Sequence, residues 1–375
     1  MSDSPFTGKL EEREMRTLSR LSPPSISLFL TLLVLLPSCS DTRPPEDSQP
    51  PAEPGSEDPT LVQAVSSITS EDIYSRIGVL AHDSMGGRDT PSPGLEMAAS
   101  WAAEEFAAMG LEPGGEDGSF IQRYEMTPRG EGGSAPVSVP NVVGLLPGND
   151  PDIRDEWVVF TAHFDHVAGG PDESGDSIYN GADDNASGTA AVMEIAQAFA
   201  MLPTPPRRSL AFVLVSGEEK GLLGARHFAQ GASLPKEAMV ADINADMVSM
   251  NWPDSIVVLG KEYTTLGPTL DRVIGSHPEV GISIMENPWP QMPLFHMSDQ
   301  SAFAQEGIPG IFFFSGLHDN LHRPSDELEE VNTDKAARVA RLMFYFGYEV
   351  AQAMERPLWT DAGREMLEEL GGGEG

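Results

Sequence analysis

Acidic and histidine side chains recur in this sequence at points where apolar segments end. Four such segments are followed by side chains that could bind a metal ion or move a proton: His163 with Asp165, Glu218 with Glu219, Asp246, and His318 with His322. Ligands of open α/β sheets bind beyond the carboxyl ends of the strands. We therefore expect these side chains to converge, although each pair taken alone would more often belong to a solvated loop.

The paired glutamates follow a segment of apolar residues directly. Neighbouring side chains in an extended or turning segment point in different directions. One carboxylate, Glu219, can therefore bind a metal ion while the other, Glu218, faces the substrate. Hydrolysis by a metal-activated water needs such a base to accept the proton of the water.

His163 and Asp165 are separated by one residue. If the strand continues through them, both side chains lie on one face. The histidine can then ligate a metal ion while the carboxylate of Asp165 accepts its other ring N–H and fixes the tautomer.

Consecutive acids lie in a Gly/Ala/Ser-rich turn that opens a predicted helix. A carboxylate is favourable there because the amino-terminal end of a helix attracts negative charge. Helix capping explains Asp183 and Ser187, whereas we interpret Asp184 as a metal ligand because of the other acids and histidines around it.

The segments that must position these residues alternate between strand and helix patterns. The predicted strands are nearly all apolar, which is typical of a largely parallel sheet covered on both faces. We expect an α/β fold with a mixed, largely parallel central sheet and helices on both faces. Predicted strands are 120–126, 141–146, 157–162, 209–215, 239–245 and 308–314; predicted helices are 70–80, 95–109, 187–202, 222–230, 266–276, 301–306 and 333–354.

Five successive motifs carry a resemblance to a known family. They are His163-Phe-Asp165, Gly181-Ala-Asp-Asp-Asn-Ala-Ser-Gly188, Gly217-Glu-Glu-Lys-Gly-Leu-Leu-Gly224, Asn244-Ala-Asp-Met247 and His318-Asp-Asn-Leu-His-Arg-Pro-Ser-Asp326. In this order they resemble the motifs of the di-zinc exopeptidase family, which includes bacterial leucyl aminopeptidases. The stretch 298–303 is also similar to the one that precedes the last ligand in that family.

The resemblance implies a role for each residue. Asp184 would bridge two Zn²⁺ ions, His163 and Asp246 would complete one metal site, and Glu219 and His322 would complete the other. Glu218 would be the general base and Asp165 would orient His163. The implied reaction is hydrolysis of amino-terminal residues from peptides. Three carboxylates and a hydroxide would neutralise the two ions, which suits a partly buried site.

Several neighbouring residues remain outside the expected ligand set. His166, His318 and Asp326 are expected to support the ligands rather than bind metal. Arg226 and Arg323 are candidates to bind a substrate carboxylate in a carboxypeptidase, but their place is not predictable from the sequence. Two other functions stay open on the same fold: a glutaminyl cyclase with one zinc ion, and a binding protein without catalysis.

The amino-terminal region reads as an export signal with an anchor. An apolar run, Ile26–Leu36, follows Arg16 and ends in a sequence that resembles a bacterial lipobox, with Cys39 as the lipid-bearing residue and the chain's one cysteine. We expect a signal peptide over 1–39, an acidic, Pro-rich tether over 40–59, a catalytic domain over 60–356 and a partly disordered tail over 357–375. Translation can start at Met1 or Met15.

Charge excludes one class of partner. The formal net charge is −35, whereas a nucleic-acid binder needs a basic surface. The amino-terminal region and the family resemblance together predict an exported, lipid-anchored protein of the bacterial cell envelope that acts on peptides. Its oligomeric state is not predictable from the sequence.

Overall fold

The computed structural model describes residues 58–128 and 135–372, which all belong to one compact unit, Gly55–Gly375. The predicted signal peptide and nearly all of the predicted tether lie outside these residues. No helix within the two described ranges is long and apolar enough to cross a membrane.

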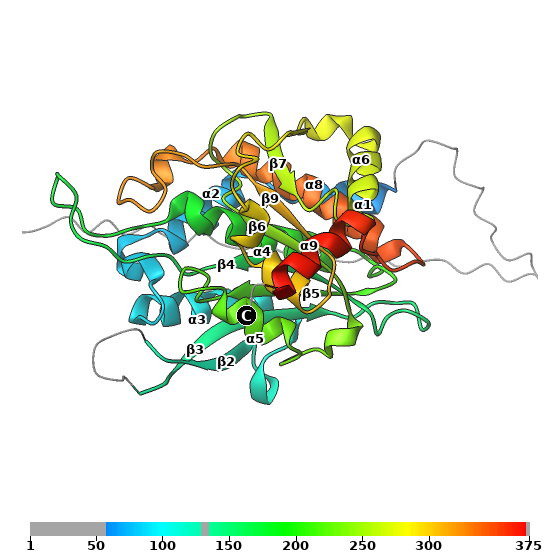
Figure 1. Ribbon diagram of the computed structural model, residues 1–375, viewed down its shortest axis with the longest axis horizontal. Helices are drawn as coiled ribbons and strands as arrows, with labels where there is room; N and C mark the ends of the chain where they lie inside the picture. Colours follow the sequence, from blue (N-terminus) through cyan, green and yellow to red (C-terminus); the bar gives the residue numbers. More distant parts are fainter. Residues whose placement is uncertain (1–57, 129–134, 373–375) are drawn as a thin grey trace, which may run out of the picture. The chain divides into compact units, whose positions relative to one another are not determined.

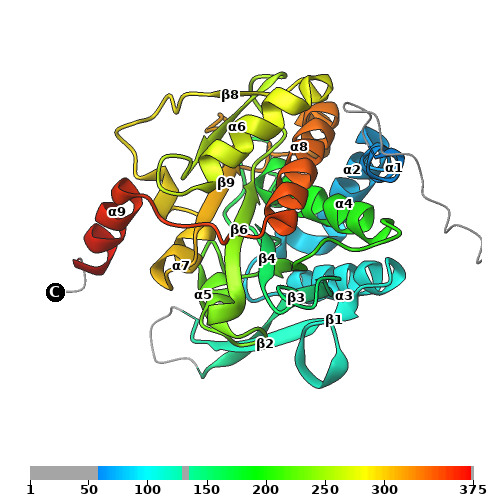
Figure 2. The same cartoon turned by 90° about the vertical axis from the view of Figure 1, so that its right-hand side faces the viewer.

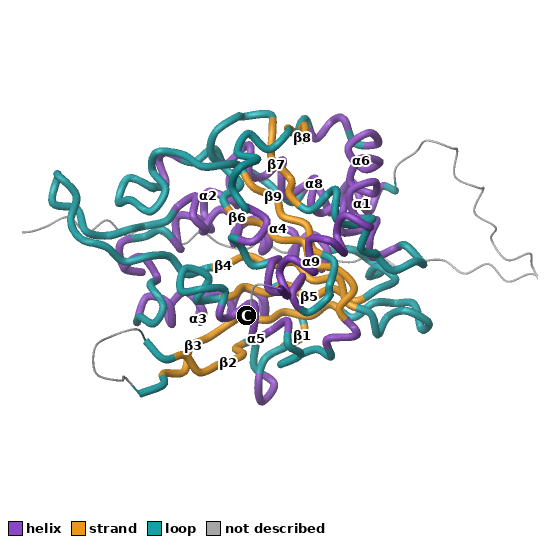
Figure 3. The backbone as a smooth tube through the Cα atoms, viewed as in Figure 1, coloured by secondary structure: helices purple, strands orange, loops and turns teal. Residues whose placement is uncertain are grey.

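One mixed sheet of nine strands runs through the described chain in the order β1-β3-β5-β4-β6-β9-β7-β8, with β2 also paired to β3. Figure 1 and Figure 3 show these strands between the helices. The strands are β1 Glu112–Pro113, β2 Ile121–Met126, β3 Val137–Leu146, β4 Trp157–His163, β5 Ser209–Val215, β6 Met239–Asp246, β7 Ser255–Leu259, β8 Ser283–Met285 and β9 Gly310–Phe314.

The middle of the sheet is parallel. Strands β5, β4, β6 and β9 pair in parallel, so their carboxyl ends meet at one edge. Antiparallel pairs flank them: β3 with β5 on one side and β7 with β9 on the other. The predicted mixed, largely parallel sheet is confirmed, and its parallel part is the part that carries the strand-end acids and histidines.

Helices cover both faces of this sheet, as Figure 2 shows. Side chains of α2, α3, α4, α6 and α8 pack in one hydrophobic cluster with one face, and side chains of α5, α7 and α9 pack against the other. The helices are α1 Pro59–Ser66, α2 Ser70–Leu80, α3 Pro93–Ala108, α4 Gly188–Ala200, α5 Leu223–Ala229, α6 Leu266–Ser276, α7 Gln300–Gln305, α8 Thr333–Gln352 and α9 Asp361–Gly372.

Alternation along the central strands explains why they are apolar throughout. On β4, Phe160 packs with the helices of the first face, whereas Val159 packs with α5 and α7 on the second. Successive residues of a strand point to opposite faces, so a sheet covered on both sides needs apolar residues at every position.

In the carboxyl-terminal segment, where we predicted a partly disordered tail over 357–375, the described residues include helix α9. Met366 on this helix is only 5% exposed within a cluster that includes Phe312. The Trp359 indole N–H donates to the carbonyl of Gly307 at 2.9 Å. Spaced apolar residues in an otherwise charged segment are enough to dock it on the second face.

We predict that Phe160→Ala destabilises the domain by about 3–5 kcal/mol, because it leaves a cavity in a close-packed core. The Phe160 ring is fully buried, and its centroid lies 5.8 Å from the centroid of the Phe199 ring and 5.5 Å from that of the Phe212 ring. Met201, which is 48% exposed, provides the control: Met201→Ala should change stability by less than about 0.5 kcal/mol. Urea unfolding measures both, and equal effects of the two variants would contradict the packing described here.

Candidate metal centre

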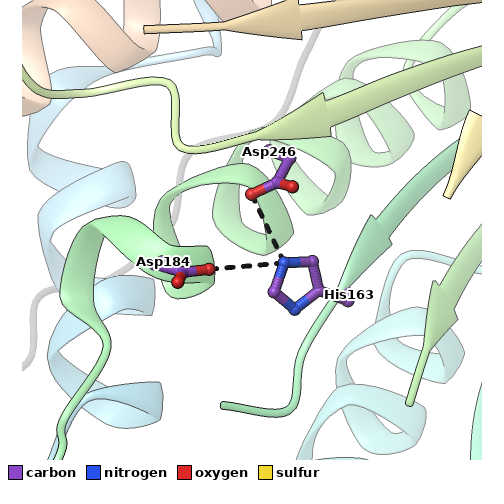
Figure 4. A group of neighbouring side chains, drawn as sticks. All are labelled: His163, Asp184 and Asp246. Atoms are coloured by element: carbon purple, nitrogen blue, oxygen red, sulfur yellow. Dashed lines mark ion pairs between the residues drawn. The ribbon is translucent and has the colours of Figure 1, made fainter. Parts of the chain in front are cut away.

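Three of the predicted ligands meet at the carboxyl edge of the sheet. His163 is the last residue of β4, Asp246 is the last residue of β6, and Asp184 lies in the turn before α4. The Nε2 atom of His163 lies 3.4 Å from Asp184 Oδ1 and 3.3 Å from Asp246 Oδ1. Figure 4 shows these buried side chains pointing toward one another. This first group could hold a metal ion.

A second group shares Asp184 and contains a residue that the sequence reasoning left out. His166 Nδ1 lies 3.5 Å from Asp184 Oδ2 and 3.2 Å from Glu219 Oε1, and these three could hold a second ion. His322 Nε2 reaches the same two oxygens, at 3.1 and 3.2 Å. His166 is buried, whereas the His322 side chain is 48% exposed.

His166, which we expected to support the ligands, lies within the second group, where it could also bind a metal ion. Strand β4 ends at His163, so the two residues before His166 lie in a loop whose course sets the direction of its side chain. Two histidines at this spacing beside a strand end are a signal that could have placed His166 in the ligand set.

Asp165 lies behind His163 as predicted, but by a different contact. The nearest acceptor to the Nδ1 atom of His163 is the backbone carbonyl of Asp165 at 3.1 Å, while the Asp165 carboxylate lies 3.7 Å away. That carboxylate instead accepts the Thr90 hydroxyl at 2.8 Å and the backbone N–H of Glu218 at 3.3 Å. Because the strand has already ended, spacing of two no longer places both side chains on one face.

The pKa values of the neighbouring glutamates Glu218 and Glu219 are shifted in opposite directions. Burial raises the pKa of Glu218 well above its ordinary value, although His163 opposes this shift. Burial would also raise the pKa of Glu219, but the nearby imidazoles of His166 and His322 outweigh this effect and lower that pKa. Two neighbouring carboxyl groups whose pKa values shift in opposite directions are suited to separate roles, one as a proton carrier and one as an anion.

Asp326 holds the turn that carries Asp184. Its two carboxylate oxygens accept the backbone N–H groups of Asp183 at 2.9 Å and Asp184 at 3.0 Å. His318 Nε2 lies 3.2 Å from the Asp183 carboxylate. Asp326 and His318 therefore support the site without joining either group, as expected from the sequence.

A buried arginine, Arg88, connects this turn to the end of β4. Its guanidinium donates to the carbonyls of Phe164 at 2.7 Å, Asn180 at 2.8 Å, Gly181 at 3.1 Å and Leu80 at 2.5 Å. Burial lowers the pKa of Arg88 to about 10, and it remains charged at neutral pH. The sequence reasoning did not single out this residue, because an isolated arginine in a Gly-rich segment resembles many surface residues.

Ser298 and Asp299 lie close to the first group. The Ser298 hydroxyl donates to Asp246 Oδ2 at 2.8 Å and also accepts from Asn244 Nδ2 at 2.8 Å. Asp299 is fully buried, and burial raises its pKa to about 8. The resemblance of 298–303 to the family had marked this stretch without assigning these contacts.

A cavity of about 450 Å³ opens onto both groups. Its polar wall contains His163, Asp184, Glu218, Glu219, Asp246 and His322. Its apolar lining residues include Met247, Leu294, Met297, Phe314, Leu317 and Leu321. Its size lies in the range of small-molecule sites, which combine apolar walls with a few convergent polar groups.

The fold and these groups define a class: α/β proteins with a histidine–carboxylate metal centre beyond the ends of parallel strands. The particular family follows from the sequence, because residues 141–347, more than half of the chain, match Peptidase family M28. The chain belongs to this family.

Known proteins with similar sequences or structures carry related names. A probable zinc metalloprotease of Pyrenophora teres is 34% identical over 202 residues, which are 51% of this chain and 41% of that protein. The structure of a zinc aminopeptidase from Bacillus subtilis has a TM-score of 0.61 at 15% identity, covering 77% of this chain and 97% of that one.

A glutaminyl cyclase structure from Porphyromonas gingivalis is also similar, with a TM-score of 0.58 at 14% identity over 74% of this chain and 97% of that one. The fold is thus shared by proteins named for different reactions. The chain spans about half the length of the curated relatives it matches.

We predict that His166→Ala lowers the zinc content per chain, because it removes a buried donor from the second group only. Zinc content after equilibration at low micromolar zinc, measured by mass spectrometry, checks this. His227→Ala, which alters a histidine outside both groups, should keep the zinc content of the wild type. Unchanged zinc content in His166→Ala would assign the second group to His322, Glu219 and Asp184 alone.

Proposed function

We propose that this chain is a zinc-dependent aminopeptidase with two metal ions per chain, bound by the two groups that share Asp184. The observation that carries the proposal is the position of Glu218. This half-buried glutamate, whose pKa is raised, lines the same cavity as both groups.

The residues present fit zinc. Several buried donor atoms of the groups, His166 Nδ1, Glu219 Oε1 and Asp246 Oδ1, form no hydrogen bond in the described chain. Buried polar atoms without partners are costly, and a cation would satisfy them. Imidazole nitrogens and carboxylate oxygens without thiolates are typical ligands of catalytic zinc.

The ligand assignment in this proposal divides the donors between two ions. His163 and Asp246 would hold one ion, Glu219, His166 and His322 would hold the other, and Asp184 would belong to both groups. Asp184 Oδ1 faces His163 and Oδ2 faces His166 and His322, which supports the bridging role.

Glu218 performs the proton transfers in the proposed reaction. Zinc, when bound, supplies Lewis acidity toward a carbonyl oxygen and toward water. The Glu218 carboxylate accepts the proton of the attacking water, holds it, and delivers it to the leaving amine. A raised pKa suits both transfers near neutral pH, because a general base works best when its pKa lies near the operating pH.

The cavity selects the residue that is removed. Its apolar wall, formed among others by Met247, Leu294 and Phe314, is suited to an aliphatic or aromatic side chain. Burial of such a side chain contributes about 1.5–3 kcal/mol. We therefore propose a preference for peptides with an apolar amino-terminal residue.

We predict that Glu218→Gln keeps its zinc but lowers kcat on leucyl-p-nitroanilide by about 10²–10⁴-fold, because the amide cannot accept a proton. Zinc content and hydrolysis of an aminoacyl-p-nitroanilide panel are measured on the same preparations. The matched control Glu104→Gln changes an exposed acid on α3 and should retain full activity.

Other outcomes of this experiment assign other functions. A wild-type chain with one zinc ion that cyclises amino-terminal glutamine would be a glutaminyl cyclase. A chain that binds zinc and peptide but turns over neither kind of substrate would be a binding protein. Wild type without bound zinc and without hydrolysis would overturn the proposal.

We also propose that the protein is exported and held at the bacterial cell envelope by lipid on Cys39. The support is the apolar run Ile26–Leu36 and the lipobox-like sequence that ends in the chain's one cysteine. An acyl-anchored domain partitions with membranes although it contains no spanning helix.

We predict that Cys39→Ser moves the protein from the membrane fraction to the soluble fraction of an expressing bacterium, because the acylated thiol is lost. Immunoblotting of the two fractions measures the change, and Ser40→Ala is the control that should stay with the membrane. If Cys39→Ser fractionates like wild type, lipidation at this residue is wrong.

A further inference from the structure

A second cavity adjoins the metal centre. Its volume is about 770 Å³, and it is lined by Thr90 and Pro91, by the end of β2 with Tyr124 and Met126, and by α5. Glu219 and Arg226 line both this cavity and the one that contains the metal centre.

Helix α5 forms the shared wall of the two cavities. Leu222, just before the helix, lines the metal-centre cavity, and Leu223 lines the second one. Arg226 lies one turn further on, with its backbone N–H bonded to the carbonyl of Leu222 at 2.9 Å. Residues three and four apart are neighbours on a helix surface, which explains how the Arg226 side chain reaches both cavities.

Arg226 carries a positive charge that the described chain does not neutralise. Arg226 is exposed. Within residues 58–128 and 135–372, its side chain forms no hydrogen bond and no ion pair. The other cationic side chain at the second cavity, Lys220, pairs with Asp89 at 2.6 Å. His227 stacks on Tyr124, and burial lowers its pKa.

Negative charge around Arg226 makes its guanidinium the favoured place for a carboxylate to bind in the second cavity. Asp89, Glu125 and Glu219 also line the second cavity, in a chain of net charge −35. A peptide carboxylate is repelled by such surroundings, except at an unpaired guanidinium, which can bind it through two parallel hydrogen bonds.

We propose that Arg226 binds the carboxyl-terminal carboxylate of short peptide substrates, so that dipeptides are preferred over longer or amidated peptides. The inference rests on the proposed aminopeptidase function. With the amino-terminal side chain in the apolar part of the metal-centre cavity and the scissile bond beside Glu218, the rest of the substrate crosses Glu219 and Arg226 into the second cavity. In a dipeptide the carboxylate follows one residue after the scissile bond, which brings it to this shared wall.

The test compares leucylglycine with leucylglycinamide, which differ only in the carboxylate, and uses the zinc-loaded full chain. Wild type should favour leucylglycine in kcat/KM by about 10- to 100-fold, the scale of a charge-assisted hydrogen-bonded pair. Arg226→Gln should reduce this ratio to about one, chiefly through the KM of leucylglycine, and Arg226→Lys should retain part of it. Because the guanidinium is exposed, the wild-type preference should also fall with added salt.

Arg323→Gln is the matched control, since Arg323 follows the candidate ligand His322 in the sequence and lines neither cavity. It should keep the preference for leucylglycine, and thermal unfolding verifies that all variants fold. A ratio near one in wild type, or a ratio lost in Arg323→Gln and kept in Arg226→Gln, overturns the assignment to Arg226. Failure of the proposed function looks different: zinc-loaded wild type then hydrolyses neither dipeptide substrate nor leucyl-p-nitroanilide.

Discussion

The buried guanidinium of Arg88 connects the segments on which the metal centre depends. Its hydrogen bonds to Phe164, Asn180 and Gly181 tie the end of β4, which carries His163, to the turn that carries Asp184. A buried cation with carbonyl partners also offsets nearby carboxylates, since Asp165, Asp326 and Asp184 all favour its charged form. The site gathers many acids at one edge of the sheet, and such a gathering is stable only with fixed partners of this kind.

The remaining contacts place each acid in a distinct setting. Asp184 is held through backbone N–H groups by Asp326, and Asp246 accepts the hydroxyl of Ser298. Glu218 and Glu219 are adjacent in sequence, yet one has a raised pKa and the other a lowered one, because only Glu219 meets His166 and His322. The same residue type can therefore serve as a proton acceptor and as an anionic ligand within one turn of chain.

The linings of the two cavities differ in a way that matches the two ends of the proposed substrate. The lining of the metal-centre cavity includes several apolar residues besides the candidate ligands, whereas the adjoining cavity is lined largely by charged and polar groups around α5. An amino-terminal side chain and a carboxyl terminus differ in the same way. In the proposed reaction, the short helix α5 would lie between the two ends of a small peptide.

Most of the fold was predictable from the sequence because long apolar strands and amphipathic helices have a strong periodic signal. The strands β4, β5, β6 and β9 and the helix α6 follow that signal closely. The short strands β7 and β8 were not predicted, and pairing decides them, because β7 pairs with β9 and β8 pairs with β7. Helix α9 was not predicted either, and it packs in the same cluster as Phe312.

The sequence alone determined which side chains stand at the ends of the parallel strands, because strand position follows from the apolar pattern. Past the last residue of a strand, side-chain direction depends on the loop rather than on a period. Only the tertiary structure decided that His166 faces Glu219, that the Asp165 carboxylate turns to Thr90 rather than His163, and that Arg226 instead of Arg323 lies between the two cavities.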